Sequence, residues 1–149
     1  MEIREVLIED LNSLADLFTS YRVFYRKTPD IAGARKFLKE RIIKKDSEIY
    51  VYESDGRLAG FVQLYPIFSS TRMKKAWLLN DLFVDEEYRG KGVSTRLIER
   101  AKKLVKETGA FGMMLETEKT NVIGNSLYPR AGFRLNEAAN FYEWEVENG

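Results

Sequence analysis

The sequence predicts a mixed α/β layer structure, and three features of the chain lead to that prediction. Runs of alternating apolar residues are typical of strands, and they are interleaved with runs in which apolar residues recur every three or four positions, as in amphipathic helices. An Asp-Gly pair, Asp55-Gly56, separates two strand-like runs, which is a strong signal of a β-hairpin. The predicted order is strand, two helices, three strands, helix, strand, helix and strand, and such an order packs helices and sheet in layers.

The first half of the chain predicts one strand, two helices and a hairpin. Residues 2–8 alternate as a strand, and Asp10 is placed to cap a helix whose apolar stripe extends to Phe24. The segment Thr28-Pro29-Asp30 breaks that helix and opens a second one, with its stripe between residues 31 and 42. Strands are predicted at residues 49–52 and 58–65, on either side of the Asp-Gly turn. Residues 66–75 are predicted to form a loop with a basic end.

The second half is predicted to begin with a long central strand, residues 76–84. An acidic turn and a short glycine loop follow, and a strongly periodic helix then extends from Val93 to a stop at Gly109. Residues 111–117 predict another strand, too apolar to lie at an edge of the sheet. A short helix is predicted at residues 121–127, and a final strand through Phe141, Trp144 and Val146.

Composition restricts the possible chemistry. The 149 residues fit one domain, and a net charge of +1 gives no basic face for nucleic acid. The chain has no Cys and no His, which excludes disulfides, zinc thiolates and Ser-His triads, and we expect no metal. Acid–base work falls to carboxylates, tyrosine, lysine, backbone or water. The N-terminus lacks the pattern of a secretion signal and no apolar run approaches ~20 residues, so we expect a cytoplasmic protein without a membrane partner.

The glycine loop, Arg89-Gly90-Lys91-Gly92, lies between a strand and a helix start. Such an order makes an anion-binding device, because loop amides converge there and the positive end of the helix dipole faces the same point. No window matches the G-x-x-x-x-G-K-[ST] pattern of a phosphate-binding P-loop. Thr95 stands where a dinucleotide fingerprint requires a third glycine. From the loop alone, a tight turn without a ligand is an equal alternative.

Two motifs resemble those of the GNAT superfamily of N-acetyltransferases. Residues 82–101, LFVDEEYRGKGVSTRLIERA, resemble the acetyl-CoA signature. Its core, Gln/Arg-x-x-Gly-x-Gly/Ala, corresponds to Arg89–Ser94, with Ser94 in place of the last Gly/Ala. The second signature, Asn-x-x-Ala-x-x-Leu-Tyr followed by Gly-Phe, is matched from Asn121 to Tyr128 and by Gly132-Phe133, with Gly124 in place of Ala. Their separation and the order of elements are also similar to the family.

The resemblance implies a fold and a cosubstrate. The fold is a mixed, mostly antiparallel central sheet of about six or seven strands, with a splayed parallel pair and four flanking helices, and residues 1–149 form a single N-acetyltransferase domain. The pantetheine arm of acetyl-CoA pairs with backbone groups in the splay, and the pyrophosphate lies on the loop amides. The implied cofactor-binding residues are Leu82, Phe83, Val84, Arg89, Gly90, Lys91, Gly92, Val93, Ser94, Thr95 and Asn121.

Tyr128 is the residue that the resemblance implies as general acid. The pKa of a tyrosine, ~10, is close enough to the ~8.5 of a thiol for the hydroxyl to protonate a leaving thiolate. The alternative is a core tyrosine at a helix end. Pro129 follows directly and disfavours helical φ/ψ at Tyr128.

The general base stays open between Asp81 and Glu116. A free alkylamine with a pKa of ~10.4 costs roughly 4.6 kcal/mol at neutral pH, and a carboxylate, water chain or desolvation must offset part of that cost. Several relatives use a Glu two residues before the Leu-Phe-Val end of the strand, where this chain has Asn80. Strand alternation predicts Asn80 and Asp81 on opposite faces. An ordinary surface or ion-pair role is the alternative for each acid.

The acceptor site is predicted from the first two helices, the 66–75 loop and the last strand. Its candidate residues are Tyr21, Tyr25, Phe68 and Tyr142, with Arg22 and Arg26 beside them; core aromatics and solvated charges are the alternative. The predicted function is direct acetyl transfer in a ternary complex to a primary amine of a small molecule, such as an amino acid or polyamine. A protein or peptide amine, or a non-catalytic acyl-CoA-binding regulator, are alternatives. The aromatic residues 141–144 suggest either a homodimer, since family members often pair through C-terminal strands, or core packing.

Overall fold

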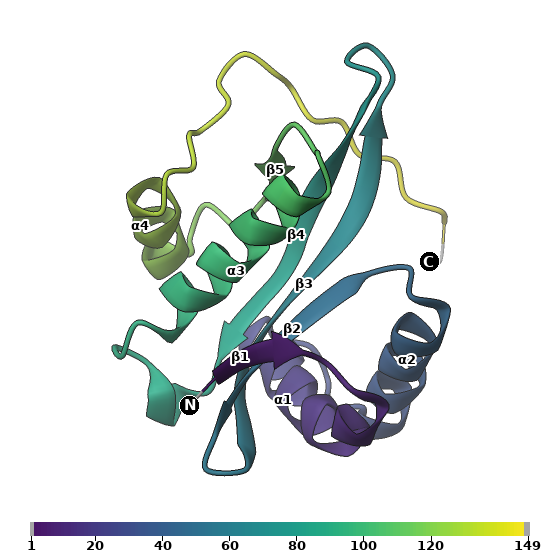
Figure 1. The fold of residues 1–149 in the computed structure, drawn as a ribbon, viewed down its shortest axis with the longest axis vertical. Helices are drawn as coiled ribbons and strands as arrows, with labels where there is room; N and C mark the ends of the chain where they lie inside the picture. The colour runs from purple at the N-terminus through teal and green to yellow at the C-terminus, as the bar shows by residue number, and fades with distance from the viewer. Residues whose placement is uncertain (1, 148–149) are drawn as a thin grey trace. The chain divides into compact units, whose positions relative to one another are not determined.

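A computed structural model describes residues 2–147 and contains a five-stranded sheet (Figure 1). In chain order the elements are β1 (Glu2–Glu5), the 3-10 helix η1 (Ile8–Asp10), α1 (Leu11–Phe24), α2 (Ile31–Lys44), β2 (Glu48–Ser54), β3 (Arg57–Ser69), β4 (Lys74–Val84), the 3-10 helix η2 (Glu86–Tyr88), α3 (Val93–Glu107), β5 (Met113–Met114) and α4 (Val122–Arg130). They belong to two compact units, Met1–Glu116 and Thr117–Gly149, and each unit is described by itself. The sheet and α1 to α3 lie in the first unit, and α4 and the chain that follows it lie in the second.

The sheet has the strand order β1-β2-β3-β4-β5 and is antiparallel except for the last pair. The predicted fold class, a mixed and mostly antiparallel sheet with one parallel pair, together with four helices, is confirmed. The sheet has five strands where about six or seven were expected.

Helices α1 and α2 cover one face of the sheet, and α3 covers the other. Alternate residues of β2 divide between the faces, as the pleat requires: Ile49 and Val51 belong to the core under α1 and α2, whereas the ring of Tyr50 lies under Arg100 of α3. The core on the first face also contains Leu14, Leu17, Phe18, Leu38, Phe61 and Phe83.

The parallel pair β4–β5 is very short. It consists of Trp77 opposite Met113 and Leu78 opposite Met114, and β4 then continues to Val84 without β5 beside it. The predicted splay of this pair is therefore present. The prediction of a longer, internal strand at residues 111–117 was wrong: β5 has two residues and is last in the sheet order, with Met114 exposed. An apolar run alone does not reveal how far a partner strand follows it.

The β3–β4 hairpin is longer than the sequence predicts. Residues 66–69 and 74–75 belong to strands, so the predicted loop at 66–75 shrinks to a short tip. Pro66 pairs with Trp77 on β4 and lies beyond Leu64, which faces Glu48 in the β2–β3 ladder. Because β2 no longer runs beside Pro66, its missing N–H leaves no ladder bond unmade, and the strand tolerates it.

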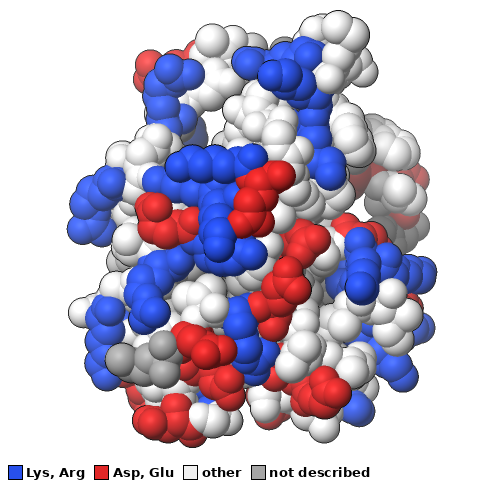
Figure 2. Space-filling model, viewed as in Figure 1, with Lys and Arg blue, Asp and Glu red and all other residues white. Residues whose placement is uncertain are grey.

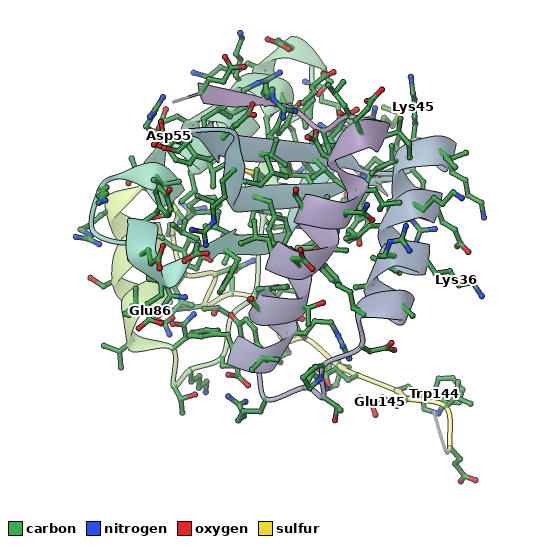
Figure 3. All side chains as sticks on the ribbon, turned by 90° about the horizontal axis from the view of Figure 1, so that it is seen from below. Lys36, Lys45, Asp55, Glu86, Trp144 and Glu145 are labelled. Atoms are coloured by element: carbon green, nitrogen blue, oxygen red, sulfur yellow. The ribbon has the colours of Figure 1, made fainter. Side chains whose placement is uncertain are left out.

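The predicted final strand is absent from the described part of the chain. Phe141, Tyr142 and Trp144 lie in chain without strand pairing and are 83%, 91% and 85% exposed, so the alternative of core packing is also wrong for them. Figure 3 shows the labelled Trp144 ring standing off the chain. Alternating apolar residues favour a strand, but a strand also needs a partner edge, and sequence pattern does not supply one.

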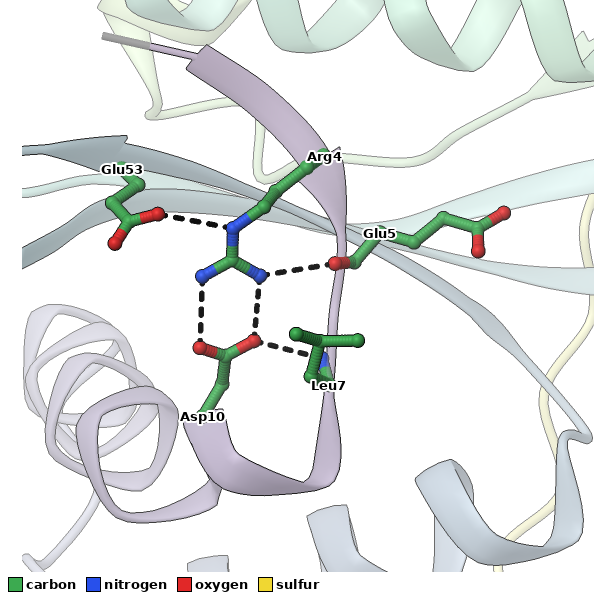
Figure 4. A network of polar contacts seen from close by, with 5 residues as sticks. All are labelled: Arg4, Glu5, Leu7, Asp10 and Glu53. Carbon is green, nitrogen blue, oxygen red and sulfur yellow. Dashed lines mark hydrogen bonds and ion pairs between the residues drawn. The ribbon is translucent and has the colours of Figure 1, made fainter.

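A polar network fixes the junction between β1 and α1 (Figure 4). The Arg4 guanidinium donates to both carboxylate oxygens of Asp10, at 2.8 and 2.9 Å, and from Nε to Glu53 at 3.0 Å. Asp10 also accepts from the backbone N–H of Leu7 at 2.7 Å. The pKa of Asp10 is lowered, chiefly by the hydrogen bond from Arg4. Asp10 thus holds the chain entering α1 through this network, and not through the predicted side-chain cap.

Basic and acidic side chains lie beside one another on the face shown in Figure 2. On α3 they form the pairs Lys102–Glu99 and Lys103–Glu107. Within residues 2–147, no helix is both long and apolar enough to cross a membrane.

Candidate functional site

The glycine loop has the backbone that its sequence suggests. Gly90 and Gly92 have φ values of 76° and 79°, in the left-handed region that side chains other than glycine rarely adopt. A Cβ added at either glycine would meet no other atom within 4 Å. The loop therefore faces open space and has room for a ligand group against its backbone.

The N-terminus of α3 is the electropositive end of this loop. Gly92 is the N-cap, and within residues 2–147 no side chain caps the helix there. The first helical hydrogen bond runs from Arg96 N–H to Gly92 O, so the amides of Val93, Ser94 and Thr95 come before it. Free amides, the helix dipole and unobstructed space together suit a pyrophosphate.

The acidic turn before the loop is tied down by Arg57. Its guanidinium donates to Asp85 at 2.6 Å and to Glu87 at 3.1 Å. Asp85 also accepts from the backbone N–H of Glu87, which closes the turn of η2. These bonds orient the chain that leaves β4, so the loop starts from a fixed position.

The end of β4 supplies backbone groups beside the loop. Leu82, Phe83 and Val84 pair with Val62, Phe61 and Gly60 of β3, and the pairs with β5 have already ended at Leu78. One side of this stretch thus has a strand partner and the other does not, within the described residues. An extended ligand can add to such an edge by backbone hydrogen bonds.

Asp81 is a buried carboxylate, 6% exposed, with three hydrogen-bond donors. Tyr21 Oη donates to Oδ1 at 2.9 Å, and Gln63 Nε2 and Asn80 Nδ2 donate to Oδ2 at 2.8 and 3.1 Å. Ser47 Oγ in turn donates to Gln63 Oε1 at 2.9 Å. Three donors thus hold the Asp81 carboxylate in place on β4, and both of its oxygens accept at least one hydrogen bond.

A β-bulge lies next to Asp81. In the β3–β4 ladder Gln63 faces Asp81 and Leu64 faces Leu79, so Asn80 is the extra residue. Asn80 is exposed and Asp81 buried, as alternation predicts, and next to the bulge the two side chains also bond to each other.

The pKa of Tyr65 depends in part on the negative charge of Asp81. Burial, followed by the negative charge of Asp81, raises the pKa of Tyr65 to about 12. A phenol in this position stays protonated at neutral pH. Tyr65 therefore adds no competing negative charge beside Asp81.

Glu116, the other candidate base, has a different environment. It is exposed at the end of the first unit, two residues after β5 and outside any strand. The two candidate bases therefore have different environments. The Asp81 carboxylate accepts hydrogen bonds from three donors, whereas Glu116 lies on an irregular segment.

The second unit contains Asn121 and Tyr128. Asn121 caps α4 by accepting from the Gly124 N–H at 3.1 Å, and its Nδ2 donates to Thr117 Oγ1 at 2.9 Å. A Cβ at Gly124 would meet Asn121 Nδ2 at 2.5 Å and Tyr128 Cε2 at 3.2 Å. An Ala at this position would therefore require the Asn121 side chain to shift.

Tyr128 is helical despite Pro129. Helix α4 extends to Arg130, and the N–H of Ala131 bonds to Leu127 O beyond the proline, so the predicted departure of Tyr128 from helical φ/ψ was wrong. The proline lies in the last turn, where it removes only one helical hydrogen bond. The Tyr128 ring lies edge-on to Phe133, with ring centroids 5.8 Å apart.

The predicted acceptor residues do not form one cluster within the first unit. Tyr21 of α1 and Tyr25, the residue after its end, are in contact, with ring centroids 5.3 Å apart. Phe68 lies far along the β3–β4 hairpin and is 76% exposed, with Lys75 near its ring. Tyr142 belongs to the second unit.

Gln63 and Ser47 are site residues that sequence reasoning missed. Gln63 is fully buried in β3, and a polar residue inside an apolar strand-like run was the signal that pointed to it. Among residues 2–147, no group of three or more His, Cys, Asp or Glu side chains could hold a metal ion.

The comparisons with known proteins identify the family. The sequence model of the acetyltransferase (GNAT) family matches residues 11–133, so the chain belongs to this family. It is 43% identical over 133 residues to the uncharacterized N-acetyltransferase YhfO of Bacillus subtilis (strain 168), covering 89% of each chain.

Two further proteins resemble the chain, one compared by structure and one by sequence. A crystal structure described as that of a probable acetyltransferase has a TM-score of 0.93 and 38% identity, with 98% of each chain covered. Streptothricin acetyltransferase of Escherichia coli is 30% identical over 121 residues, which are 80% of this chain and 67% of that protein. The fold and the family are thus established together as those of a GNAT N-acetyltransferase.

Proposed function

We propose that this protein transfers the acetyl group of acetyl-CoA to a primary amine of a small molecule, by direct attack in a ternary complex. The observation that carries the proposal is the Gly90–Gly92 loop, with its positive φ angles, open surroundings and uncapped helix start. Acetyl-CoA supplies an activated acetyl thioester, and the residues present suit its pyrophosphate and its extended arm.

The protein's own residues divide the binding task. The amides from Arg89 to Ser94 hold the pyrophosphate, and Thr95 adds a hydroxyl. Leu82 to Val84 offer backbone groups to the pantetheine arm on the side away from β3. Asn121 contacts the cosubstrate from α4, a role that the family resemblance implies.

Asp81 is the general base in this proposal. It takes a proton from the acceptor amine as the new C–N bond forms, and the C–S bond of the thioester breaks in the same transfer. Its three hydrogen-bond donors support this role over Glu116, because a fixed carboxylate meets the geometric demand on a base. Tyr128 donates its hydroxyl proton to the departing sulfur. The absence of Cys disfavours an acyl-thiol intermediate on the enzyme.

A small-molecule acceptor is supported by the streptothricin-acetylating relative and by the aromatic groups at the end of α1. Tyr21, Tyr25, Phe68 and Tyr142 stay as the acceptor-side candidates. An acceptor that carries a carboxylate beside its amine suits the basic residues Arg22 and Arg26.

The test is thiol release from acetyl-CoA across a panel of amino acids, polyamines, aminoglycosides, streptothricin and peptides. We expect turnover with at least one small amine and a thermal shift on adding acetyl-CoA. Turnover with peptides alone would show that the acceptor is a protein or peptide amine and not a small molecule. A thermal shift without turnover would indicate a regulator. The absence of both a thermal shift and turnover would contradict CoA binding as well as catalysis.

A further inference from the structure

We propose that Tyr21 is a positioning residue for acetyl transfer, whose hydroxyl fixes the Asp81 carboxylate and leaves a lone-pair site of Oδ1 for the acceptor amine. This inference rests on the proposed function and deepens it. It gives the Tyr21 hydroxyl a role toward the base, and leaves only the ring face for contact with the acceptor.

The Tyr21 ring is held rigidly enough for this role. It contacts the rings of Phe18, Tyr25, Phe61 and Phe83, with centroid separations of 5.9, 5.3, 5.5 and 5.7 Å. These neighbours come from α1, β3 and β4, so the ring is packed from several sides. The hydroxyl then reaches Asp81 Oδ1 at 2.9 Å across 60 residues of sequence. Because the packed ring is already restricted, its hydroxyl loses little conformational freedom when it forms this hydrogen bond.

The donors are distributed unequally over the two carboxylate oxygens. Oδ2 accepts from Gln63 and Asn80, and Oδ1 accepts from Tyr21. An ionised carboxylate offers about four lone-pair sites, so the site that is left in this network belongs to Oδ1. Oδ1 is therefore the oxygen that can take a proton from an amine or from a water bound to it.

Gln63 fixes the other half of the carboxylate. Ser47 donates to its carbonyl oxygen, so the amide nitrogen must point toward Asp81. All three neighbours thus donate to Asp81, and each stabilises the charged form over the neutral one.

Tyr21 reaches Asp81 from α1, with the ring of Tyr25 against its own ring, and Tyr65 lies on β3 with a pKa raised to about 12 by burial and by Asp81. Arg41 of α2 and Asp46 act on Tyr65 with opposite signs. Replacing Tyr21 with Phe therefore removes one of the three donors to the Asp81 carboxylate, a donor that favours its charged form.

The first experiment measures how loss of the Tyr21 hydroxyl affects the titration of Asp81, and it does not require enzymatic turnover. The carboxyl carbon of Asp81 is followed by NMR through a pH titration of the unmodified protein and of Tyr21→Phe, with Asp81→Asn to assign the signal. We expect the titration midpoint to move up, because one donor to the charged form is lost. The matched control is Tyr50→Phe, which removes a buried hydroxyl on the opposite face of the sheet, under Arg100, and should leave the midpoint unchanged. An unmoved midpoint in Tyr21→Phe would overturn the proposal.

The second experiment connects the bond to catalysis. If Asp81 is the base, log(kcat/KM) rises with pH at slope one where only the amine loses a proton, and at slope two below the pKa of Asp81. Tyr21→Phe should move the bend to higher pH by about one unit and cost up to about tenfold in kcat/KM below it. A decrease of kcat/KM by the same factor at every pH would indicate a packing defect and reject the positioning role. Absence of turnover in the unmodified protein would instead reject the proposed function, while the NMR titration would still decide whether Tyr21 holds Asp81.

Discussion

Arg89 is bonded to Val84: its Nε donates to the Val84 carbonyl oxygen at 3.0 Å, and its guanidinium lies over the rings of Phe24 and Phe83. The first residue of the glycine loop is thereby attached to the last residue of β4. The loop amides and the strand edge, which serve different parts of the same cosubstrate in our proposal, are held in one arrangement by this side chain.

Replacing Arg89 with Gln should weaken acetyl-CoA binding by about tenfold, the effect of losing one charge-assisted hydrogen bond. Isothermal titration of acetyl-CoA measures it. Lys91→Gln is the matched control, since Lys91 carries the same charge in the same loop but lies over Tyr88. Equal losses in both variants would mean that charge alone matters and that the bond to Val84 does not.

Gly92→Val should abolish measurable acetyl-CoA binding, because it forces a β-branched residue into a positive φ at the start of α3. Gly56→Val is the control: Gly56 has a φ of 73° in the β2–β3 turn, with similarly open surroundings. Both variants should lose about 1–3 kcal/mol of unfolding free energy, and only Gly92→Val should lose binding. Retained binding in Gly92→Val would contradict the pyrophosphate loop.

Asp81→Asn should lower kcat by about 10²–10⁴-fold, the range for loss of a general base, with acetyl-CoA affinity little changed. Glu116→Gln is the comparison that separates the two candidate bases, and it should leave kcat within about threefold, as expected for a carboxylate outside the reaction. Steady-state kinetics at saturating acetyl-CoA provide both numbers. The reverse pattern would move the base to Glu116.

Tyr128→Phe should lower kcat with little change in KM for acetyl-CoA, because the hydroxyl acts on the departing sulfur and not on binding. A loss of about 10²-fold or more is expected for a general acid. Leu127→Ala, a neighbouring change on α4 that keeps the hydroxyl, checks for damage to the helix. Full activity in Tyr128→Phe would return Tyr128 to a structural role.

Asp10→Asn should flatten the acid limb of the stability curve. The pKa of Asp10 is lowered in the folded protein by Arg4, so its contribution is fully present above its unfolded pKa of ~3.9 and is lost as pH falls through the folded value. Urea unfolding at pH 7 and at pH 3 measures this, with a loss of about 1–2 kcal/mol expected at pH 7 and less at pH 3. Asp46→Asn removes a more exposed bond to Arg41 and should cost less. Equal costs at both pH values would contradict the role of the Arg4–Asp10 pair.

The parts of the site that depend on local sequence could be predicted. Gly90 and Gly92 suggested a loop before a helix, and the hairpin at Asp55-Gly56 was found where an Asp-Gly pair indicates one. In both places the backbone conformation is determined by a few neighbouring residues, which tolerate positive φ.

The parts that depend on distant pairing could not be predicted. The Tyr21–Asp81 bond joins residues 60 apart, and no periodicity in either segment indicates it. The bulge at Asn80 follows from how β3 and β4 align, which changed the expected relation of Asn80 to Asp81. The predicted last strand failed for the same reason, because a strand pattern does not specify its partner.

The early end of the β4–β5 pairing leaves a ladder that a bound molecule can complete, and this has a consequence for how long the protein survives. A ligand that binds only the folded state adds RT ln(1 + [L]/Kd) to the unfolding free energy, about 2.7 kcal/mol at a hundredfold excess over Kd. An acetyltransferase whose sheet is finished by acetyl-CoA would therefore be more resistant to unfolding and proteolysis when acetyl-CoA is abundant. Its abundance would then follow the supply of its own acetyl donor.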